Sequence, residues 1–377
     1  MDFTPTEEQT AAQGLAARIF GDLSTHDRLV AAGTGTDAEL WKELCAAGLT
    51  GAVEEIGLLG LVLLLEEQGR TTAQVPFASS CVYGLLAVAE HGTDEQRERL
   101  LPRFRDGTAV ATGAFPAGGT VQADAEAGLS GTVPMVPWLR EATHVLVAAA
   151  DRSLWIVRTG DTGVLTEPVE TTAPWSAGRL VLSGAPAERL GEASGEQLGG
   201  APGERLGGAP GEPLGGAAPG EQTGGAEAYE KVLAMARTAF AGLQAGVCAG
   251  SLARAVEHTN TREQFGRPLS TNQGVLLRAA DAHMDTEAIR VTAYEAAWLH
   301  DRALPCAAQA LTAAWWASEA GKRVVHAAQH LHGGTGADLD HPVHRHFLWG
   351  RQLDAYLGCG SEVLQELGGL LVKEGSR

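Results

Sequence analysis

The segment from Tyr229 to the C-terminus constrains the fold most, because it carries the apolar spacing of long helices separated only by short turns. One helix is expected from Tyr229 onward, and two more over residues 271–300 and 307–330. Helices of this length can bury their apolar faces only against one another. The sequence therefore predicts an antiparallel bundle, with segments 342–356 and 361–372 packed on its end. The stripe expected to face the core of the first helix is Val232, Met235, Ala236, Ala239, Leu243 and Val247.

The residues before this bundle divide into a helical zone and a β zone. Residues 1–107 show helical spacing, with Thr6 and Thr93 placed to cap helices. Residues 108–190 change to short alternating or β-branched runs such as TAVATGAF and HVLVAAA, which predict a small antiparallel β unit. Helices, then strands, then helices indicate an α+β fold, in which a β domain lies between two helical domains and the second of these spans 227–377.

Residues 191–226 form a repetitive segment rich in Gly and Pro. Units such as GEQLGGAP and GERLGGAP start at Gly195, Gly203 and Gly211, and the pattern then slips to Gly220. One Leu per unit cannot bury an apolar face, so a solenoid repeat is excluded. The composition favours a disordered insert over a functional repeat.

The charge balance excludes some classes of partner. There are 28 Lys and Arg against 46 Asp and Glu, a net charge of −18, which repels phosphate backbones and argues against a nucleic-acid protein. A locally basic pocket for a phosphorylated small molecule stays compatible with it. No apolar run reaches the roughly 18 residues of a membrane span, and MDFTPTEEQ lacks the basic start and apolar core of a signal peptide. The five Cys are scattered without a C-x-x-C pair, which is typical of reduced thiols in the cytoplasm.

Two stretches carry residues suited to a phosphorylated ligand. TREQFGRPLSTNQG (261–274) lies between two expected helices and offers the guanidiniums of Arg262 and Arg267 beside the ring of Phe265. Guanidinium groups bind phosphate oxygens through paired hydrogen bonds, and a ring packs on a flat base. QHLHGGTGADLDHPVHRHF (329–347) follows a third helix, and its Gly pair permits a positive φ or a close backbone approach. Taken alone, each stretch is also compatible with a helix C-cap and solvated arginines.

Together the two stretches resemble the C-terminal domain of the acyl-CoA dehydrogenase family. The pattern is R-x-x-F-G from residue 262 followed by Q-x-x-x-G-G from residue 329, and WKELCAAGL, EEQGRTT, VPFASS and GTDEQRERLLPRFRDG also match the family's usual sequence. The resemblance implies an N-terminal helical domain, a middle β domain, a C-terminal four-helix bundle, bound FAD and an acyl-CoA thioester substrate. It also implies that six residues reach the FAD of a neighbouring subunit, with the Gln-to-Gly-Gly stretch at its ADP half, which makes oligomerisation a condition of cofactor binding. These are Arg262, Phe265, Gln273, Gln329, Gly333 and Gly334.

The chain departs from the family at the catalytic base. In the family a Glu removes the α-proton of the thioester while hydride leaves Cβ for the flavin, and such a base contributes about 10²- to 10⁴-fold in rate. Its usual position falls on Leu357, or on Gly358 if the match slides, and the position used by a minority of members falls on Ala236. The catalytic residue is therefore unknown. Glu230 is interpreted as an ordinary exposed residue and Glu362 as first-turn helix charge.

The flavin-facing part of the β domain departs as well. The family's aromatic, aliphatic and hydroxyl residues fall on Met135, Val136 and Pro137, and proline supplies neither the hydroxyl nor the backbone donor. The loop FPAGGT (115–120) matches the family only loosely, and the P-E-x-x-G-G-type loop before GLLGLVLLL is shortened. The pieces that contact a chain's own isoalloxazine and substrate are altered, whereas those that reach a partner's cofactor are intact.

This pattern favours one of three hypotheses. Some bacterial members of the family pair two dissimilar chains, and we expect this chain to be the subunit that lacks the base and completes the other chain's FAD site. The alternatives are a homo-oligomer that uses FAD for a different biosynthetic reaction, and a non-catalytic scaffold. By resemblance, an electron-transfer flavoprotein is a possible acceptor. No metal site is expected in the His-rich stretch 330–346, because it already matches the FAD pattern, and the acyl group leaves no recognisable mark in the sequence.

Overall fold

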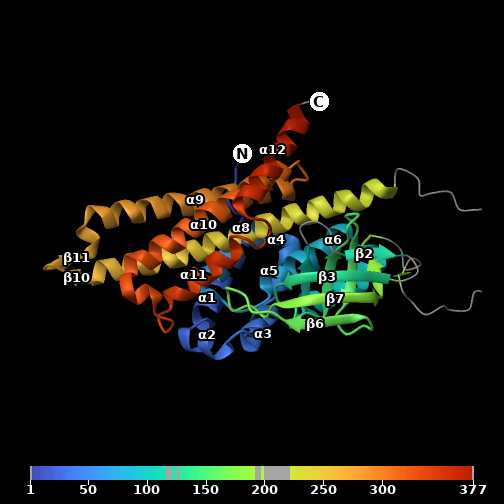
Figure 1. Cartoon of the computed structure of the whole chain (residues 1–377), viewed down its shortest axis with the longest axis horizontal. Helices are drawn as coiled ribbons and strands as arrows, with labels where there is room; N and C mark the ends of the chain where they lie inside the picture. Colours follow the sequence, from blue (N-terminus) through green and yellow to red (C-terminus); the bar gives the residue numbers. More distant parts are fainter. Residues whose placement is uncertain (1, 116–120, 125–127, 192–196, 199–220, 376–377) are drawn as a thin grey trace, which may run out of the picture.

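The computed structural model describes residues 2–115, 121–124, 128–191, 197–198 and 221–375. Long helices form one half of the molecule, and a β unit lies beside the N-terminal helices in the other half (Figure 1). The expected α+β arrangement, with helical N- and C-terminal parts and a middle β region, is confirmed.

The N-terminal part is helical, and both expected caps are present. The hydroxyl oxygens of Thr6 and Thr93 each accept a hydrogen bond from the backbone N–H three residues later, and their own backbone N–H groups donate to the side-chain oxygen of the glutamine at that position, which completes a capping box. The elements are α1 (Glu7–Leu23), α2 (His26–Ala32), α3 (Ala38–Ala46), α4 (Leu49–Thr71), α5 (Phe77–Ser79), the π-helical turn η1 (Ser80–Leu86), α6 (Ala87–His91) and α7 (Asp94–Arg105).

Helix α4 bends at Gly57, at the place where the sequence indicates a shortened loop. Gly57 has φ 72° and ψ −170°, and the carboxylate of Asp301 accepts hydrogen bonds from the backbone N–H groups of Leu58 (2.7 Å) and Leu59 (2.9 Å). The carboxylate thus caps the second half of α4 from the C-terminal part of the chain.

The β unit consists of two sheets. One has the strand order β1-β4-β5-β8-β9 and the other β2-β3-β7-β6, and their facing apolar side chains form a core of their own. The prediction of a purely antiparallel unit is wrong at one pair, because β1 and β4 run parallel: the chain leaves β1, builds β2 and β3 in the second sheet, and returns in the same direction. The strands are β1 (Ala111–Ala114), β2 (Val121–Asp124), β3 (Gly128–Val136), β4 (His144–Ala148), β5 (Leu154–Arg158), β6 (Val164–Pro168), β7 (Gly178–Ala185), β8 (Ala187–Arg189) and β9 (Gln197–Leu198).

Most of the expected insert at 191–226 lies outside the described residues. Two parts of it belong to regular elements instead, since β9 pairs with β8 and α8 already begins at Glu221. Helix α8 thus begins five residues before the expected end of the insert at 226, where Gly224 and Gly225 have low helix propensity.

The C-terminal part is the expected bundle. Helices α8 (Glu221–Thr261), α9 (Gln273–Asp301) and α10 (Ala307–His332) pack against one another, α11 (Val343–Leu353) packs on α8 and α10, and α12 (Gly360–Gly375) packs on α10. Between α8 and α9 stand the short strands β10 (Glu263–Gln264) and β11 (Arg267–Pro268) and the 3-10 turn η2 (Leu269–Thr271), and η3 (Gly333–Ala337) follows α10. The part of α8 from Gly225 to Thr261 is long and apolar enough to cross a membrane, but 89% of its most apolar window is buried in the protein, as for a core helix.

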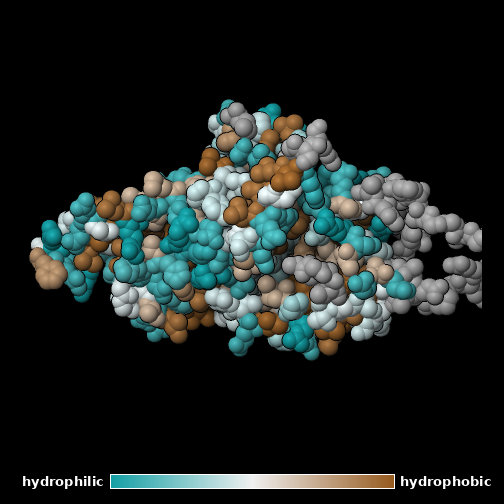
Figure 2. All heavy atoms as spheres, turned by 45° about the horizontal axis from the view of Figure 1, so that its top comes forward, coloured by the Kyte–Doolittle hydropathy of each residue, from teal (hydrophilic) through white to brown (hydrophobic). Residues whose placement is uncertain are grey.

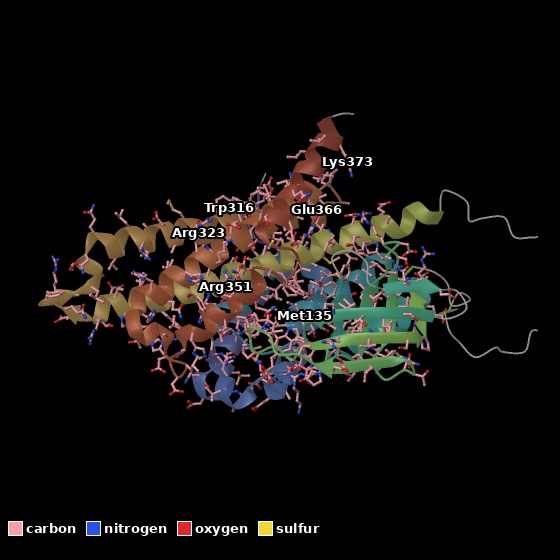
Figure 3. All side chains as sticks on the ribbon, viewed as in Figure 1. Met135, Trp316, Arg323, Arg351, Glu366 and Lys373 are labelled. Carbon is pink, nitrogen blue, oxygen red and sulfur yellow. The ribbon has the colours of Figure 1, made fainter. Side chains whose placement is uncertain are left out.

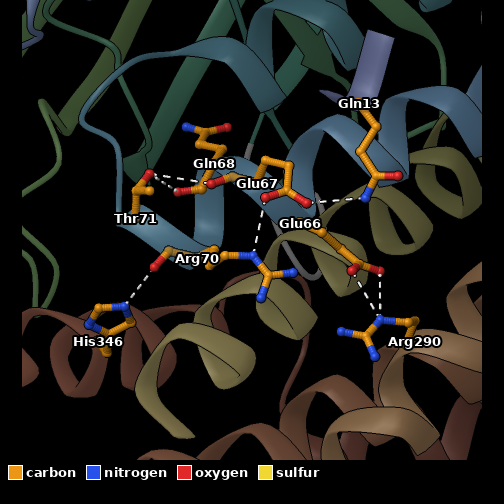
Figure 4. Close-up of polar contacts among 8 residues, drawn as sticks. All are labelled: Gln13, Glu66, Glu67, Gln68, Arg70, Thr71, Arg290 and His346. Atoms are coloured by element: carbon orange, nitrogen blue, oxygen red, sulfur yellow. Dashed lines mark hydrogen bonds and ion pairs between the residues drawn. The ribbon is translucent and has the colours of Figure 1, made fainter. Parts of the chain in front are cut away.

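Polar contacts on α4 join the N-terminal helices to the bundle (Figure 4). Glu66, only 2% exposed, pairs with Arg290 of α9 at 3.0 Å. His346 of α11 donates a hydrogen bond from Nε2 to the carbonyl of Arg70 at 3.0 Å. The segment EEQGRTT, which matches the family pattern, thus lies where α4 meets α9 and α11.

Candidate functional site

The R-x-x-F-G motif forms a tight hairpin at one end of the bundle (Figure 1). The backbone of Arg262 accepts a hydrogen bond from Leu269 N–H at 2.9 Å, and β10 pairs antiparallel with β11. Phe265 and Gly266 occupy the two turn positions with φ 53° and 74°, which is the backbone of a type I′ turn. A positive φ is unusual for phenylalanine, and its side chain is 99% exposed. The hairpin therefore presents an uncovered ring at its tip.

The Q-x-x-x-G-G motif forms a second loop where α10 ends. Gln329 donates a hydrogen bond from Nε2 to the carbonyl of Gly336 at 3.2 Å, which closes η3 over the helix end. Gly333 has φ 61°, and a Cβ added at Gly333 or Gly334 would meet no atom within 4 Å. The backbone at both glycines is thus open to a ligand.

Packing brings the two motifs to the same end of the bundle. The rings of His258 and His332 stack at 4.6 Å and join the last turns of α8 and α10. Ala255, Ala328 and Leu331 form a small buried cluster against which Val275 of α9 packs. The expected FAD-binding residues, hereafter the clamp (Arg262, Phe265, Gln273, Gln329, Gly333 and Gly334), therefore lie on three adjoining elements.

The clamp end of the bundle favours an anionic ligand. In the described part of the chain, no carboxylate pairs with the exposed guanidinium of Arg262. Burial, the neighbouring His332 and the charge of Arg262 together lower the pKa of His258. The pKa of His341 is lowered as well, by burial and by the neighbouring His332, Arg254 and His258. A histidine whose pKa is lowered is neutral at pH 7, so the positive charge at this end is that of guanidiniums such as Arg254 and Arg262, with which a diphosphate would pair.

The flavin-facing positions lie where the β unit meets the helices, and Figure 3 shows Met135 there. Pro137 is buried, and its carbonyl accepts a hydrogen bond from Thr112 Oγ1 at 2.5 Å. The next residue, Trp138, is 2% exposed and stacks on Trp175 with ring centroids 6.2 Å apart. The position that supplies a hydroxyl in the family is thus occupied by the buried pyrrolidine ring of Pro137.

Aromatic side chains continue from there to the expected base position. Trp175 contacts Tyr356 at 6.1 Å, and Tyr356 directly precedes Leu357. Tyr356 then packs edge-on against Phe240 at 4.7 Å, and its hydroxyl lies 3.1 Å from that of Tyr83. The full set, hereafter the aromatic chain, comprises Trp138, Trp175, Trp349, Tyr356, Phe240, Tyr83, Phe115 and Tyr229. These rings occupy the space between the flavin-facing and base positions.

Very little room is left beside Leu357. The cavity lined by Phe240, Tyr356, Leu357 and Gly358 has a volume of about 20 Å³, enough for roughly one water molecule. Ala236, at the alternative base position, is fully buried. Among the described residues, the cavity directly beside Leu357 is thus too small for an acyl chain.

The nearby carboxylates have other partners. Glu230 is exposed and forms an ion pair with Arg152, and Glu362 accepts a hydrogen bond from the backbone N–H of Cys359 at 3.0 Å. Glu366 of α12 makes a two-pronged ion pair with Arg237, at 2.8 and 2.7 Å. None of these groups stands free beside Leu357.

The histidines of the 330–346 stretch serve the fold in several ways. His332 Nδ1 bonds the carbonyl of Ala328 at 2.8 Å, His344 Nδ1 that of His341 at 2.7 Å, and His346 that of Arg70. Among the residues that the structure describes, no group of three or more His, Cys, Asp or Glu is arranged to hold a metal ion.

The clamp residues are predicted from the sequence, whereas the aromatic chain is not. Its members come from the N-terminal helices, from loops of the β unit and from the bundle, so no spacing in the sequence links them. The available signal was local, because a Trp follows Pro137 and a Tyr precedes Leu357.

Comparisons with known proteins agree with this geometry. Residues 6–108 match the family described as acyl-CoA dehydrogenase, N-terminal domain, and residues 223–367 match acyl-CoA dehydrogenase, C-terminal domain. Acyl-CoA dehydrogenase FadE27 of Mycobacterium tuberculosis is 33% identical over 402 residues, which cover 98% of each chain.

Two solved structures are similar over the whole chain. A variant of the Tcur3481-Tcur3483 steroid ACAD is 39% identical, with a TM-score of 0.85 over 98% of this chain and 99% of that one. The ChsE4-ChsE5 complex from Mycobacterium tuberculosis contains a chain that is 31% identical, with a TM-score of 0.83 over 99% of both. FAD is the cofactor of this group of oxidoreductases. By both of its matched domains and by relatives that span its full length, the chain belongs to the acyl-CoA dehydrogenase family.

Proposed function

We propose that this chain is one subunit of a two-chain acyl-CoA dehydrogenase, in which it completes the FAD site of its partner and supplies no catalytic base. The observation that carries the proposal is the contrast between two sites of the same chain. The clamp is open and carries the exposed guanidinium of Arg262, whereas the space that would hold the chain's own isoalloxazine and thioester is occupied by the aromatic chain.

The clamp has the features of a surface that a partner covers. A phenylalanine that is 99% exposed at the tip of a hairpin gains nothing in the isolated chain. Its positive φ is a small local strain, and such strain is kept where a function requires it. Both features are accounted for if Phe265 packs on a cofactor held by another subunit.

Each clamp residue has a definite task in this proposal. Arg262 pairs with the diphosphate, and Phe265 packs on the cofactor. The backbones of Gly333 and Gly334 approach the ADP half closely, because no side chain stands in the way. The amides of Gln273 and Gln329 donate to its oxygens. The bound FAD supplies the acceptor for hydride from Cβ of the thioester.

The reaction that we propose for the two-chain enzyme is α,β-dehydrogenation of a bulky acyl-CoA. The relatives support this class, since one similar structure is a steroid ACAD and another is a ChsE4-ChsE5 complex. We propose an electron-transfer flavoprotein as the acceptor and the cytoplasm as the location, in keeping with the unpaired thiols of all five Cys.

Activity of separate and combined chains tests the proposal. The chain is co-expressed with each family member of its own genome that retains the carboxylate and the flavin-facing hydroxyl. We expect acyl-CoA oxidation only from a pair, and we expect it to vanish when the partner's Glu is replaced by Gln. Leu357→Glu in this chain should not rescue that loss, because the aromatic chain keeps the thioester out. Oxidation of an acyl-CoA by this chain alone would refute the proposal.

A further inference from the structure

The short turn between α9 and α10 places a cysteine close to an imidazole. Ala303 has φ 53°, and its N–H donates to the carbonyl of His300 at 2.8 Å, so the chain reverses within a few residues. Cys306 is the N-cap residue of α10, and its carbonyl accepts the first hydrogen bond of that helix, from the N–H of Ala310 at 2.8 Å. Helix α9 starts at the clamp and ends at this turn, about 40 Å away (Figure 1). The turn is therefore separate from the cofactor-binding end of the bundle.

The imidazole of His300 connects Cys306 to a carboxylate. His300 Nε2 lies 2.8 Å from Glu90 Oε1 of α6, and the side chains of His300 and Glu90 are 13% and 33% exposed. The thiol of Cys306 is hydrogen-bonded to the same imidazole. Burial favours the neutral ring, but the contacts with Cys306 and Glu90 outweigh it and raise the pKa of His300 to about 10. The ring is therefore an imidazolium at neutral pH, held between a sulfur and a carboxylate.

This arrangement contains the groups that make a cysteine nucleophilic in proteins. The reactive form is the thiolate, and an adjacent imidazolium and a helix N-terminus both stabilise a thiolate. A third group that orients the imidazole completes such a site, and Glu90 holds that position here. Cys306 is half-buried, so a small reagent can reach its sulfur.

The other cysteines provide contrasts within the same molecule. Cys81 and Cys248 are fully buried, and burial raises the pKa of both thiols. Cys359 is half-buried like Cys306, and it directly precedes α12 as Cys306 precedes α10. Its sulfur, however, lies 3.3 Å from the hydroxyl of Ser361 instead of beside an imidazole. Cys359 is thus a matched internal control for the effect of His300.

A cavity of about 540 Å³ gives access to the Glu90–His300 pair from solvent. Its lining includes His300 and four carboxylates, those of Glu54, Glu55, Glu90 and Asp301. The chain carries a net charge of −18, and hydrophilic side chains make up much of the surface of the bundle (Figure 2). An anionic oxidant such as glutathione disulfide is therefore repelled. A small neutral oxidant that travels in water is not.

We infer that Cys306, with His300 and Glu90 beside it, is a thiol that reacts with hydrogen peroxide. The thiolate sulfur attacks one peroxide oxygen, so that an S–O bond forms and the O–O bond breaks. His300 gives its proton to the departing hydroxide, and the products are a sulfenic acid and water. Sulfur loses two electrons and the peroxide gains them. The inference does not depend on the proposed function, because all of its groups belong to one chain.

Labelling of the full-length chain with hydrogen peroxide and dimedone, which traps sulfenic acids, tests the inference by mass spectrometry. In the wild type we expect Cys306 to be labelled roughly tenfold or more faster than Cys359 at neutral pH. His300→Gln should lower the rate at Cys306 to that at Cys359, and Glu90→Gln should give a rate between the two. The wild-type comparison needs no variant, so it decides even if a substitution destabilises the chain.

Three results would overturn the inference or part of it. Equal labelling of Cys306 and Cys359 in the wild type would show that the imidazole confers no reactivity. An unchanged rate at Cys306 in His300→Gln, with Cys81 and Cys248 still unlabelled in a folded protein, would do the same. With glutathione disulfide the preference for Cys306 over Cys359 should be smaller than with peroxide, and a larger preference would show that the class of oxidant is wrong.

Discussion

Arg262 is the residue on which cofactor binding depends most in this account. Its side chain is exposed, and it stands at the base of the hairpin whose tip carries the exposed Phe265. A charged hydrogen bond contributes about 1.5–3 kcal/mol, so Arg262→Ala should weaken FAD binding by the two-chain complex roughly 10- to 100-fold. Arg262→Lys keeps the charge without the paired geometry and should fall between. The measurement is FAD retained per complex after gel filtration, and equal retention in all three proteins would contradict the assigned role.

Trp175 tests whether the filled space contributes to stability. It is 1% exposed and contacts Trp138, Trp349 and Tyr356. Trp175→Ala should lower the free energy of unfolding by about 3–5 kcal/mol, as large-to-small core substitutions do. Phe265→Ala is the control, since a ring that is 99% exposed should change stability by less than about 0.5 kcal/mol. Urea unfolding measures the free energy of unfolding of both variants. A small loss in Trp175→Ala would show that the aromatic chain is loosely packed.

Two buried histidines make stability depend on pH. Burial lowers the pKa of His346 to about 4, and burial followed by the charges of Arg103 and Arg99 lowers the pKa of His144 to about 4. A histidine of the unfolded chain has a pKa near 6.5. Between about pH 4 and pH 6.5 the unfolded chain therefore binds protons at His144 and His346, whereas the folded chain does not. Stability should therefore be complete above about pH 6.5 and fall as the pH drops toward 4.

The expected loss is on the order of 1–2 kcal/mol per histidine between pH 7 and pH 5. His346→Gln should reduce this slope by about one proton, because Gln can still donate to the carbonyl of Arg70. Urea unfolding at a series of pH values measures the slope. An unchanged slope in the variant would mean that His346 is protonated in the folded chain.

At the scale of single residues, the sequence predicts the residues of recognisable motifs and does not predict those whose contacts arise only from packing. Arg262, Phe265, Gln329 and the Gly pair are predicted as site residues because they belong to two motifs at a characteristic separation. The packing of Trp175 is not predicted, since its partners are distant in sequence and meet only through tertiary packing. The sequence predicted which family residues are missing but not that rings fill the space they leave.

At the scale of elements, the bend of α4 shows how one glycine positions two parts of the chain. Gly57 has φ 72°, and an added Cβ would lie 2.7 Å from Asp301 Oδ1, the atom that caps Leu58. Gly57→Ala should therefore cost about 2–3 kcal/mol, from the left-handed backbone together with the disturbed cap.

Gly14→Ala in α1 is the matched control for that substitution. A Cβ at Gly14 would meet nothing within 4 Å, so alanine should leave stability unchanged or raise it by up to about 1 kcal/mol. Thermal unfolding of both variants compares the two positions. Equal effects would mean that the Asp301 cap does not depend on the bend.

Elements were predicted well where one local signal decides them. The capping boxes at Thr6 and Thr93 and the three long helices follow from side-chain chemistry and apolar spacing. The parallel pairing of β1 with β4 does not, because strand direction depends on how the chain crosses between two sheets. The start of α8 within the Gly-rich segment was missed for a related reason: packing and helix extension outweighed local propensity there.

At the scale of the whole molecule, the two ends of the bundle differ in their surroundings. The clamp end has an exposed guanidinium and two glycines with open backbone, whereas the region beside the β unit is packed with rings. A chain with one working half of a composite site has a use only beside a chain with the other half. The sequence indicated this division by its pattern of kept and altered motifs, and the packing of the aromatic chain supports it with a physical reason.

The FAD content of separate and combined chains tests this account most directly. Each chain is purified alone and as the pair, and FAD is quantified from its visible absorbance against protein mass. We predict that this chain alone is colourless and that the pair holds one FAD for every two chains, because this chain clamps a cofactor but has no room for its own. Two FAD per pair, or a yellow isolated chain that oxidises acyl-CoA, would contradict the account.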